Sequence, residues 1–435
     1  MDESAAVRLR EIDLHDKRHP PTTMAPIHEF VDMPLFAHTS IAPTGIDVLD
    51  DIFHNAIQVQ ASDIHLECHG QLLRVRFRVD GLLQDAAEPP ASLKDAILSR
   101  LKVLAAMDIA EKRLPQDGRF QYKHSNHAVD MRVSSLPTTQ GEKLVVRLLH
   151  YSQERPSLAT LGCTQRDEQR LSQILHQPHG LILITGPTGS GKTLSLYSCL
   201  DLLNTIERNV STVEDPVEIH LQGVNQVQTN DKAGLTFAHT LRALLRQDPD
   251  VLMVGEIRDT ETAEIAMQAA QTGHLVLSTL HTNDAPSALA RLSHMGIAPF
   301  QVAASVSLIM AQRLVRCLCA QCKLPLSQVQ RDTWQQSLSA QDLRIAEEHG
   351  LATATLYRAV GCKDCHQGYK GRTGLFQVMP ITAAMQQLIV QEQDSAALAQ
   401  QALNEGVHTL RQAGWIKVMQ GMTSIEEVMG ATVHA

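Results

Sequence analysis

Residues 181–203 read LILITGPTGSGKTLSLYSCLDLL, and this segment is the most informative about the fold. Its apolar start predicts a strand, its glycine-rich middle a loop, and its end a helix. In such a loop, converging backbone N–H groups and the positive end of the following helix hold phosphate oxygens. The candidate nucleotide-binding residues are the whole loop: Gly186, Pro187, Thr188, Gly189, Ser190, Gly191, Lys192 and Thr193. We expect Lys192 to reach the β- and γ-phosphates of ATP and Thr193 to ligate Mg²⁺.

The surrounding chain alternates strand and helix patterns. Short β-branched runs, LILIT, NVSTV, DVLMV and HLVLSTL, are separated by helical periodicity, which predicts a parallel sheet covered on both faces. Upstream, two helical segments and several strand-like runs predict a smaller α+β domain. In chain order we expect a short polar leader (1–43), an N-terminal α+β domain (44–150), a linker (151–165), an α/β domain (166–313), a cysteine module (314–378) and a helical C-terminal region (379–435).

The composition indicates a cytoplasmic protein. The chain has 435 residues, 43% of them hydrophobic, and a formal net charge of −9. This acidic excess argues against a general nucleic-acid binder. No run approaches the roughly 20 apolar residues that span a bilayer, and the polar N-terminus lacks the apolar stretch of a signal peptide.

Two acids follow predicted strands. Glu214 comes at the end of NVSTV, and Glu256 follows DVLMV after one glycine. The carboxyl ends of parallel strands meet at the ligand crevice, so we expect Glu214 to orient water or act as general base and Glu256 to hold the Mg²⁺ shell. Arg258 is close enough in sequence to brace phosphate or an acid. The alternative for each acid is an ordinary turn at a strand end.

Two histidines flank the strand HLVLSTL. His281 follows the strand at its carboxyl end, where it is a candidate phosphate sensor, whereas His274 precedes the strand. The alternative is that each is a structural histidine held by hydrogen bonds.

The motifs GPTGSGKT, TVEDPVE, LLRQDPDVLMVGEIRD and TGHLVLSTLHTND, in this order, resemble the secretion ATPase superfamily. ASDIHLE, RLPQDGR, RVSSLPTTQGEK, and QRLV followed by CxxC are most similar to the type II secretion and type IV pilus assembly ATPases, over roughly residues 44–435. The resemblance implies a RecA-like P-loop ATPase domain behind a smaller PAS-like domain, with ATP bound between them. It also implies a homo-hexameric motor that is peripheral to the inner membrane and acts on an inner-membrane platform protein.

The resemblance also implies roles for individual residues. Lys192 and Thr193 correspond to the Walker A pair, Glu214 to the catalytic acid of the Asp-box and Glu256 to the Walker B acid. His274 and His281 correspond to the His-box. Arg119 and Arg132 correspond to the arginines presented to phosphate, and Arg147 is a weaker third candidate. A guanidinium can neutralise the charge that phosphoryl transfer spreads over the γ-phosphate oxygens. The alternative for these arginines is a solvated strand face.

Four of the eight cysteines form two CxxC pairs. Cys319 and Cys322 are separated by residues 323–361 from Cys362 and Cys365. Four thiolates make a closed tetrahedral zinc site, which we favour over redox exchange because no redox context accompanies the pairs. Cys317 is an extra thiol that could exchange register with Cys319. Pilus retraction ATPases lack this module, so by resemblance it points to assembly or secretion.

The function that we expect is therefore a cytoplasmic ATPase motor that hydrolyses ATP to ADP and phosphate to power type IV pilus assembly or type II protein secretion. One alternative is a nucleic-acid-translocating motor, which the lack of a basic, aromatic-rich strand disfavours, so no nucleic acid is expected as a partner. The other is a nucleotide-gated scaffold without turnover. Retention of four residues disfavours the scaffold: Lys192, Thr193, Glu214 and Glu256.

Overall fold

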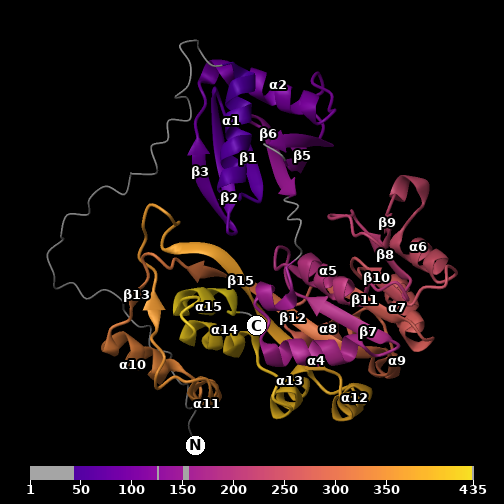
Figure 1. The fold of residues 1–435 in the computed structure, drawn as a ribbon. Helices are drawn as coiled ribbons and strands as arrows, with labels where there is room; N and C mark the ends of the chain where they lie inside the picture. The colour runs from indigo at the N-terminus through magenta and orange to yellow at the C-terminus, as the bar shows by residue number, and fades with distance from the viewer. Residues whose placement is uncertain (1–43, 125–126, 150–155, 434–435) are drawn as a thin grey trace, which may run out of the picture.

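The computed structural model describes residues 44–124, 127–149 and 156–433, which form a smaller N-terminal domain and a larger C-terminal body (Figure 1). The expected leader at 1–43 and residues 151–155 of the expected linker lie outside the described residues. Within the described residues, no helix is long and apolar enough to cross a membrane.

The N-terminal domain packs two helices against one face of an antiparallel sheet. The strand order is β3-β2-β1-β6-β5-β4. Helix α1 begins at a capping box formed by Thr44 and Asp47 and buries its apolar stripe, as its periodicity predicts. The bounds are α1 (Gly45–Gln58), β1 (Asp63–His69), β2 (Leu72–Val79), β3 (Leu82–Ala87), α2 (Lys94–Leu104), β4 (Gln116–His124), β5 (His127–Thr138) and β6 (Gly141–Leu149). One apolar core joins both helices to the sheet.

The other face of this sheet is charged. Five side chains lie in one row across five strands, because each is the register partner of the next: Arg78, Asp63, Arg147, Arg132 and Arg119. Asp63 accepts a hydrogen bond from Arg147 at 3.1 Å and lies 3.7 Å from Arg78. One buried carboxylate therefore partly balances an arginine-rich face.

The larger body is built on a seven-stranded sheet of order β15-β12-β7-β11-β10-β8-β9. All neighbours are parallel except β15, which pairs antiparallel with β12 at the edge. The bounds are β7 (Gly180–Thr185), β8 (Val210–Glu214), β9 (Asn225–Gln228), β10 (Val251–Val254), β11 (Leu275–Leu280), β12 (Val306–Leu318) and β15 (Tyr369–Pro380). The α/β fold class predicted from the sequence is confirmed.

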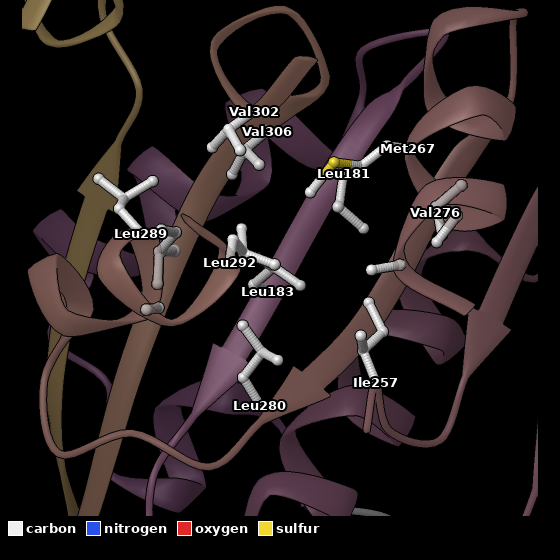
Figure 2. Packing of buried hydrophobic residues seen from close by; sticks show 14 of the residues in the cluster. Leu181, Leu183, Ile257, Met267, Val276, Leu280, Leu289, Leu292, Val302 and Val306 are labelled. Carbon is white, nitrogen blue, oxygen red and sulfur yellow. The ribbon is translucent and has the colours of Figure 1, made fainter. Parts of the chain in front are cut away.

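Helices cover both faces of this sheet. The helices are α3 (Leu158–Leu161), α4 (Gln165–Leu175), α5 (Lys192–Leu203), α6 (Phe237–Leu244), α7 (Thr260–Gln271), α8 (Ala285–His294) and α9 (Pro299–Ser305). Strand β7 is fully buried because its alternate residues enter two different cores. Leu181 and Leu183 enter the core that Figure 2 shows, where they lie among Val276 and Leu280 of β11 and Leu292 of α8.

The cysteine pairs continue directly from two strands of this sheet. Residue 313, where the α/β domain was expected to end, lies inside β12, and residue 378, the expected end of the cysteine module, lies inside β15. Between the pairs the chain forms β13 (Leu324–Pro325), α10 (Gln328–Ser337), α11 (Ala340–Glu348) and β14 (Tyr357–Arg358). The C-terminal helices are α12 (Ala383–Val390), α13 (Ser395–Asn404), α14 (Leu410–Met419) and α15 (Ile425–Ala431).

Candidate active site

The phosphate loop joins β7 to the first turn of α5, as predicted. All three of its glycines adopt positive φ, +150° at Gly186, +78° at Gly189 and +88° at Gly191, which side-chain-bearing residues rarely adopt. Space is restricted as well, because a Cβ at Gly186 would lie 2.4 Å from the carbonyl oxygen of Gln312. Only glycine therefore fits this backbone against β12.

Lys192 lies inside the loop rather than in solvent. Its Nζ donates to the carbonyl oxygens of Gly186 at 2.8 Å and Pro187 at 3.0 Å. Burial lowers the pKa of Lys192, and the negative charge of Glu256 opposes that shift. The ammonium is thus held over the loop, where a bound phosphate would compete with the two carbonyl groups.

Gln312 of β12 supports the loop from behind, and the sequence analysis did not single it out. Its side chain is 1% exposed, and its Oε1 accepts a hydrogen bond from Ser195 Oγ of α5 at 2.7 Å. Its Nε2 has no hydrogen-bond partner among the described residues and lies 2.9 Å from the position of a Cβ at Gly191. The QRLV motif contains this residue, but a single polar side chain in an apolar strand gave no specific signal.

Glu214 ends β8 and is buried, with 4% exposure. It accepts hydrogen bonds from Tyr197 Oη, from Thr212 Oγ1 at 2.7 Å and from Gln226 Nε2 at 3.0 Å. Burial, and then the hydrogen bond to Glu214, raise the pKa of Tyr197. A carboxylate offers about four acceptor positions, so three donors leave one for a water molecule.

Glu256 follows β10 after one glycine and lies beside two of the candidate residues, Arg258 and His281. Arg258 forms an ion pair with Glu256 Oε1, and His281 Nε2 lies 3.5 Å from Glu256 Oε2. The hydrogen bond to Glu256 raises the pKa of Arg258. The side chain of Glu256 is mostly buried. The side chain of Arg258 is more than half exposed, and that of His281 is half exposed.

An open pocket of about 650 Å³ borders the phosphate loop. Its wall is formed by Pro187, Thr188, His281, Thr282, Asn283, Ser287, Ala290, Arg291 and His294. His281, at the carboxyl end of β11, therefore lines the same pocket as Pro187 and Thr188 of the loop. His274 lies at the opposite end of β11, where its Nδ1 is 3.0 Å from the carbonyl oxygen of Ala269.

Hydrogen bonds and an ion pair join the N-terminal domain to the larger body, the ion pair lying between Arg372 Nε of β15 and Asp80 Oδ1 at 3.5 Å. Arg132 Nη2 of β5 donates to the carbonyl oxygen of Val217, in the loop after β8, at 2.8 Å. Asp80, in the turn between β2 and β3, accepts from the amide of Gly371 in β15 at 2.8 Å. A second cavity of about 340 Å³ lies beside Asp80 and is also lined by Gly189 of the phosphate loop.

The candidate arginines therefore differ in position. Arg132 reaches the larger body, and Arg119 lies exposed beside it as its register partner. Arg147 is engaged within its own domain by Asp63.

The four predicted cysteines converge. The Sγ atoms of Cys319, Cys322, Cys362 and Cys365 all lie within 4.8 Å of one another. Individual Sγ···Sγ distances of 3.6–3.9 Å approach the ~3.8 Å that tetrahedral Zn–S bonds of about 2.3 Å produce. Backbone N–H groups of Gly361 and Cys362 also point at Sγ atoms. Cys317 is not part of this cluster.

Comparison with known proteins places the chain in a family. Residues 39–430 match the family model described as type II/IV secretion system protein. The type IV pilus assembly ATPase PilB of Pseudomonas aeruginosa is 49% identical over 379 residues, which cover 87% of this chain and 66% of that protein. Type II secretion system protein E of the same organism is 46% identical, with 99% of this chain and 83% of that protein covered.

A solved structure supports the fold. The Legionella pneumophila ATPase DotB aligns with a TM-score of 0.67 at 19% identity, covering 92% of this chain and 98% of DotB. The chain spans about two thirds of the length of the PilB proteins that it matches. The resemblance inferred from the motifs is confirmed: the chain belongs to the type II/IV secretion system protein family.

Proposed function

We propose that the chain binds ATP against the phosphate loop, between its two domains, and hydrolyses it to ADP and phosphate. The observation that carries this proposal is the meeting of Lys192, Glu256 and His281 at the carboxyl edge of the sheet, beside an open pocket. A helix N-terminus, an ammonium group and a buried carboxylate at one edge of the sheet suit the binding of a nucleoside triphosphate with its metal ion. The relatives named above are a type IV pilus assembly ATPase and a type II secretion system protein, and the first of these agrees with this chemistry.

Each residue has a role in this proposal. Lys192 neutralises the β- and γ-phosphates, and Thr193 and Glu256 hold the Mg²⁺ shell. Glu214 accepts a proton from, or orients, the attacking water through its remaining acceptor position. Arg119 and Arg132 supply positive charge from the N-terminal domain, and His281 senses the γ-phosphate through Glu256. Mg²⁺, when bound, would neutralise charge that develops on the phosphate oxygens.

A structural zinc ion fits the four-cysteine cluster. The donor set is complete, its sulfur spacing suits tetrahedral zinc, and two backbone amides point at sulfur atoms. When bound, zinc would tie the start of the 323–361 excursion to its end. It would stabilise the fold there rather than take part in hydrolysis.

The proposed biological role is that of a homo-hexameric cytoplasmic motor, peripheral to the inner membrane, that drives type IV pilus assembly or type II secretion through an inner-membrane platform protein. Family membership supports this role. Affinity capture from native membranes should recover such a platform protein, whose identity would name the pathway. Recovery of nucleic acid instead would favour a translocating motor.

Hydrolysis itself is tested by phosphate release from Mg·ATP by the zinc-loaded chain, with Lys192→Ala as the comparison. We expect turnover by the wild type and loss of both binding and turnover in the variant. A wild-type protein that binds ATP but releases no phosphate would reduce the chain to a nucleotide-gated scaffold.

A further inference from the structure

A single peptide group links the N-terminal domain to Glu214. Arg132 Nη2 donates to the carbonyl oxygen of Val217 at 2.8 Å. The N–H at the other end of the same peptide group, that of Glu218, donates to Tyr197 Oη at 3.3 Å. Tyr197 Oη in turn donates to Glu214 Oε2. The three bonds run from a guanidinium to a carboxylate without interruption.

The direction of every bond is consistent along this chain. Each group that accepts a hydrogen bond from the Arg132 side donates one toward Glu214, with a cation at one end and an anion at the other. Bonds arranged in this way polarise one another, so the loss of one link weakens the rest. Tyr197 is 1% exposed and Glu214 4% exposed, so water cannot readily replace either group.

We call this series of three hydrogen bonds, from Arg132 through the Val217–Glu218 peptide group and Tyr197 to Glu214, the relay. Its two ends belong to different domains. Arg132 is on β5 of the N-terminal domain, whereas Tyr197 is on α5, one turn beyond Lys192 and Thr193. The Arg132 link therefore exists only while the N-terminal domain lies against the loop after β8. The other two links lie wholly within the larger body.

We propose that Tyr197 is a positioning residue that couples the placement of the N-terminal domain to Glu214 through the Val217–Glu218 peptide group. The hydrogen bond from Arg132 fixes the orientation of this peptide group. The peptide group in turn fixes the hydroxyl of Tyr197, and the hydroxyl holds the carboxylate of Glu214 in one orientation. The proposal rests on the proposed hydrolytic function for its kinetic consequence, but the relay itself is testable without hydrolysis.

The kinetic test is a double-mutant cycle with Arg132→Ala and Tyr197→Phe. The loss of one hydrogen bond to a charged group predicts that Tyr197→Phe lowers kcat about tenfold and leaves KM for ATP nearly unchanged. Because both residues act along one path, the two effects on kcat should combine to less than their product in the double variant. Multiplying effects would show that the two residues act independently and would overturn the proposal.

Tyr369→Phe is the matched control. It removes another buried tyrosine hydroxyl, which hydrogen-bonds to Ser424 Oγ at 2.8 Å in the same body, outside the relay. Its effect should multiply with that of Arg132→Ala. Arg132→Lys keeps a cationic donor and should restore part of the lost rate, which a purely steric role for Arg132 would not predict.

Hydrogen exchange tests the relay independently of turnover. Mass spectrometry of the segment that contains the Glu218 amide should show about fivefold faster exchange in Arg132→Ala and in Tyr197→Phe, with no further gain in the double variant. If the wild type hydrolyses no ATP, the proposed function fails while this measurement still decides the relay. If Tyr197→Phe does not fold, Arg132→Ala alone decides it, since unchanged exchange at Glu218 would refute the coupling.

Discussion

Loss of metal from the four-cysteine cluster should be visible in tryptophan fluorescence. The chain contains two tryptophans, Trp334 and Trp415, which pack edge to face with ring centroids 5.4 Å apart. Trp334 lies on α10, inside the 323–361 excursion that the two CxxC pairs enclose, and Trp415 lies on α14. Both are buried, at 5% and 1% exposure. The intrinsic emission therefore reports on how the excursion packs against the C-terminal helices.

The magnitudes predict which interaction dominates. Burial of one large aromatic side chain, about 150–250 Å² at about 25 cal/mol per Å², contributes about 4–6 kcal/mol. Structural zinc contributes about 10–16 kcal/mol of apparent binding free energy in small modules. Burial of Trp334 contributes less free energy than zinc binding does. We therefore expect the excursion to detach when zinc is removed and Trp334 to become exposed to water.

The assay combines metal analysis with fluorescence during chelation. We expect one zinc per chain in freshly reduced protein, and a shift of the emission to longer wavelength as zinc is removed. Cys319→Ser should lose the metal, whereas Cys317→Ser, two residues away and outside the cluster, should keep it. Protein without zinc, or equal zinc loss in the two serine variants, would contradict a zinc site at these four cysteines. Unchanged emission after complete chelation would show that zinc does not hold the excursion in place.

Three further predictions concern the catalytic site and the helical region. Glu256→Gln should leave ATP binding largely intact and slow phosphate release about 10²–10³-fold, because the acid does not cradle the phosphates; near-normal turnover would remove its assignment. Arg119→Ala should lower hydrolysis more than it lowers ring assembly, as phosphate release and sedimentation on the same sample would show. Burial, and then the charge of Arg166, lower the pKa of His408 from 6.5 to about 4. The unfolded chain therefore binds a proton at His408 at higher pH than the folded chain does. The free energy of unfolding should be highest above pH 6.5 and should fall by up to about 3 kcal/mol as the pH drops toward 4. Urea unfolding should show a shallower loss for His408→Asn, and equal pH slopes would contradict the prediction.

Local signals in the sequence predicted much of the fold. The phosphate loop, the helix that follows it and the buried strands around it follow from composition and periodicity alone. The convergence of the two CxxC pairs follows from their chemistry, since four thiols in two pairs indicate one metal site. The edge of the sheet was not predicted. Strands β12 and β15 pair with each other across the whole cysteine module, and nothing local in either strand specifies that pairing.

The parts of the site that were not predicted depend on backbone atoms and on buried polar side chains. Tyr197 lies in a segment whose pattern indicates only a helix, and its hydrogen bond to Glu214 arises from the packing of α5 on β8. Gln312 contacts the phosphate loop only because β12 lies beside β7. The target of Arg132 is a main-chain carbonyl oxygen, which has no signature in a sequence. Arg147 was a weaker candidate, and its ion pair with Asp63 gives it a partner within its own domain.

We propose that the chain works as one subunit of a coupled homo-hexameric ring, in which closure of one N-terminal domain moves its neighbours. ATP can shift such an equilibrium only if its contacts differ between the open and closed arrangements, and Arg119 and Arg132 would supply such a difference if they reach the phosphates only in the closed arrangement. The most direct test is phosphate release by rings assembled from wild-type and Glu256→Gln chains in varied proportions. A coupled ring predicts that activity falls faster than in proportion to the mutant fraction. A strictly linear decline would show that the subunits act independently and would contradict the account.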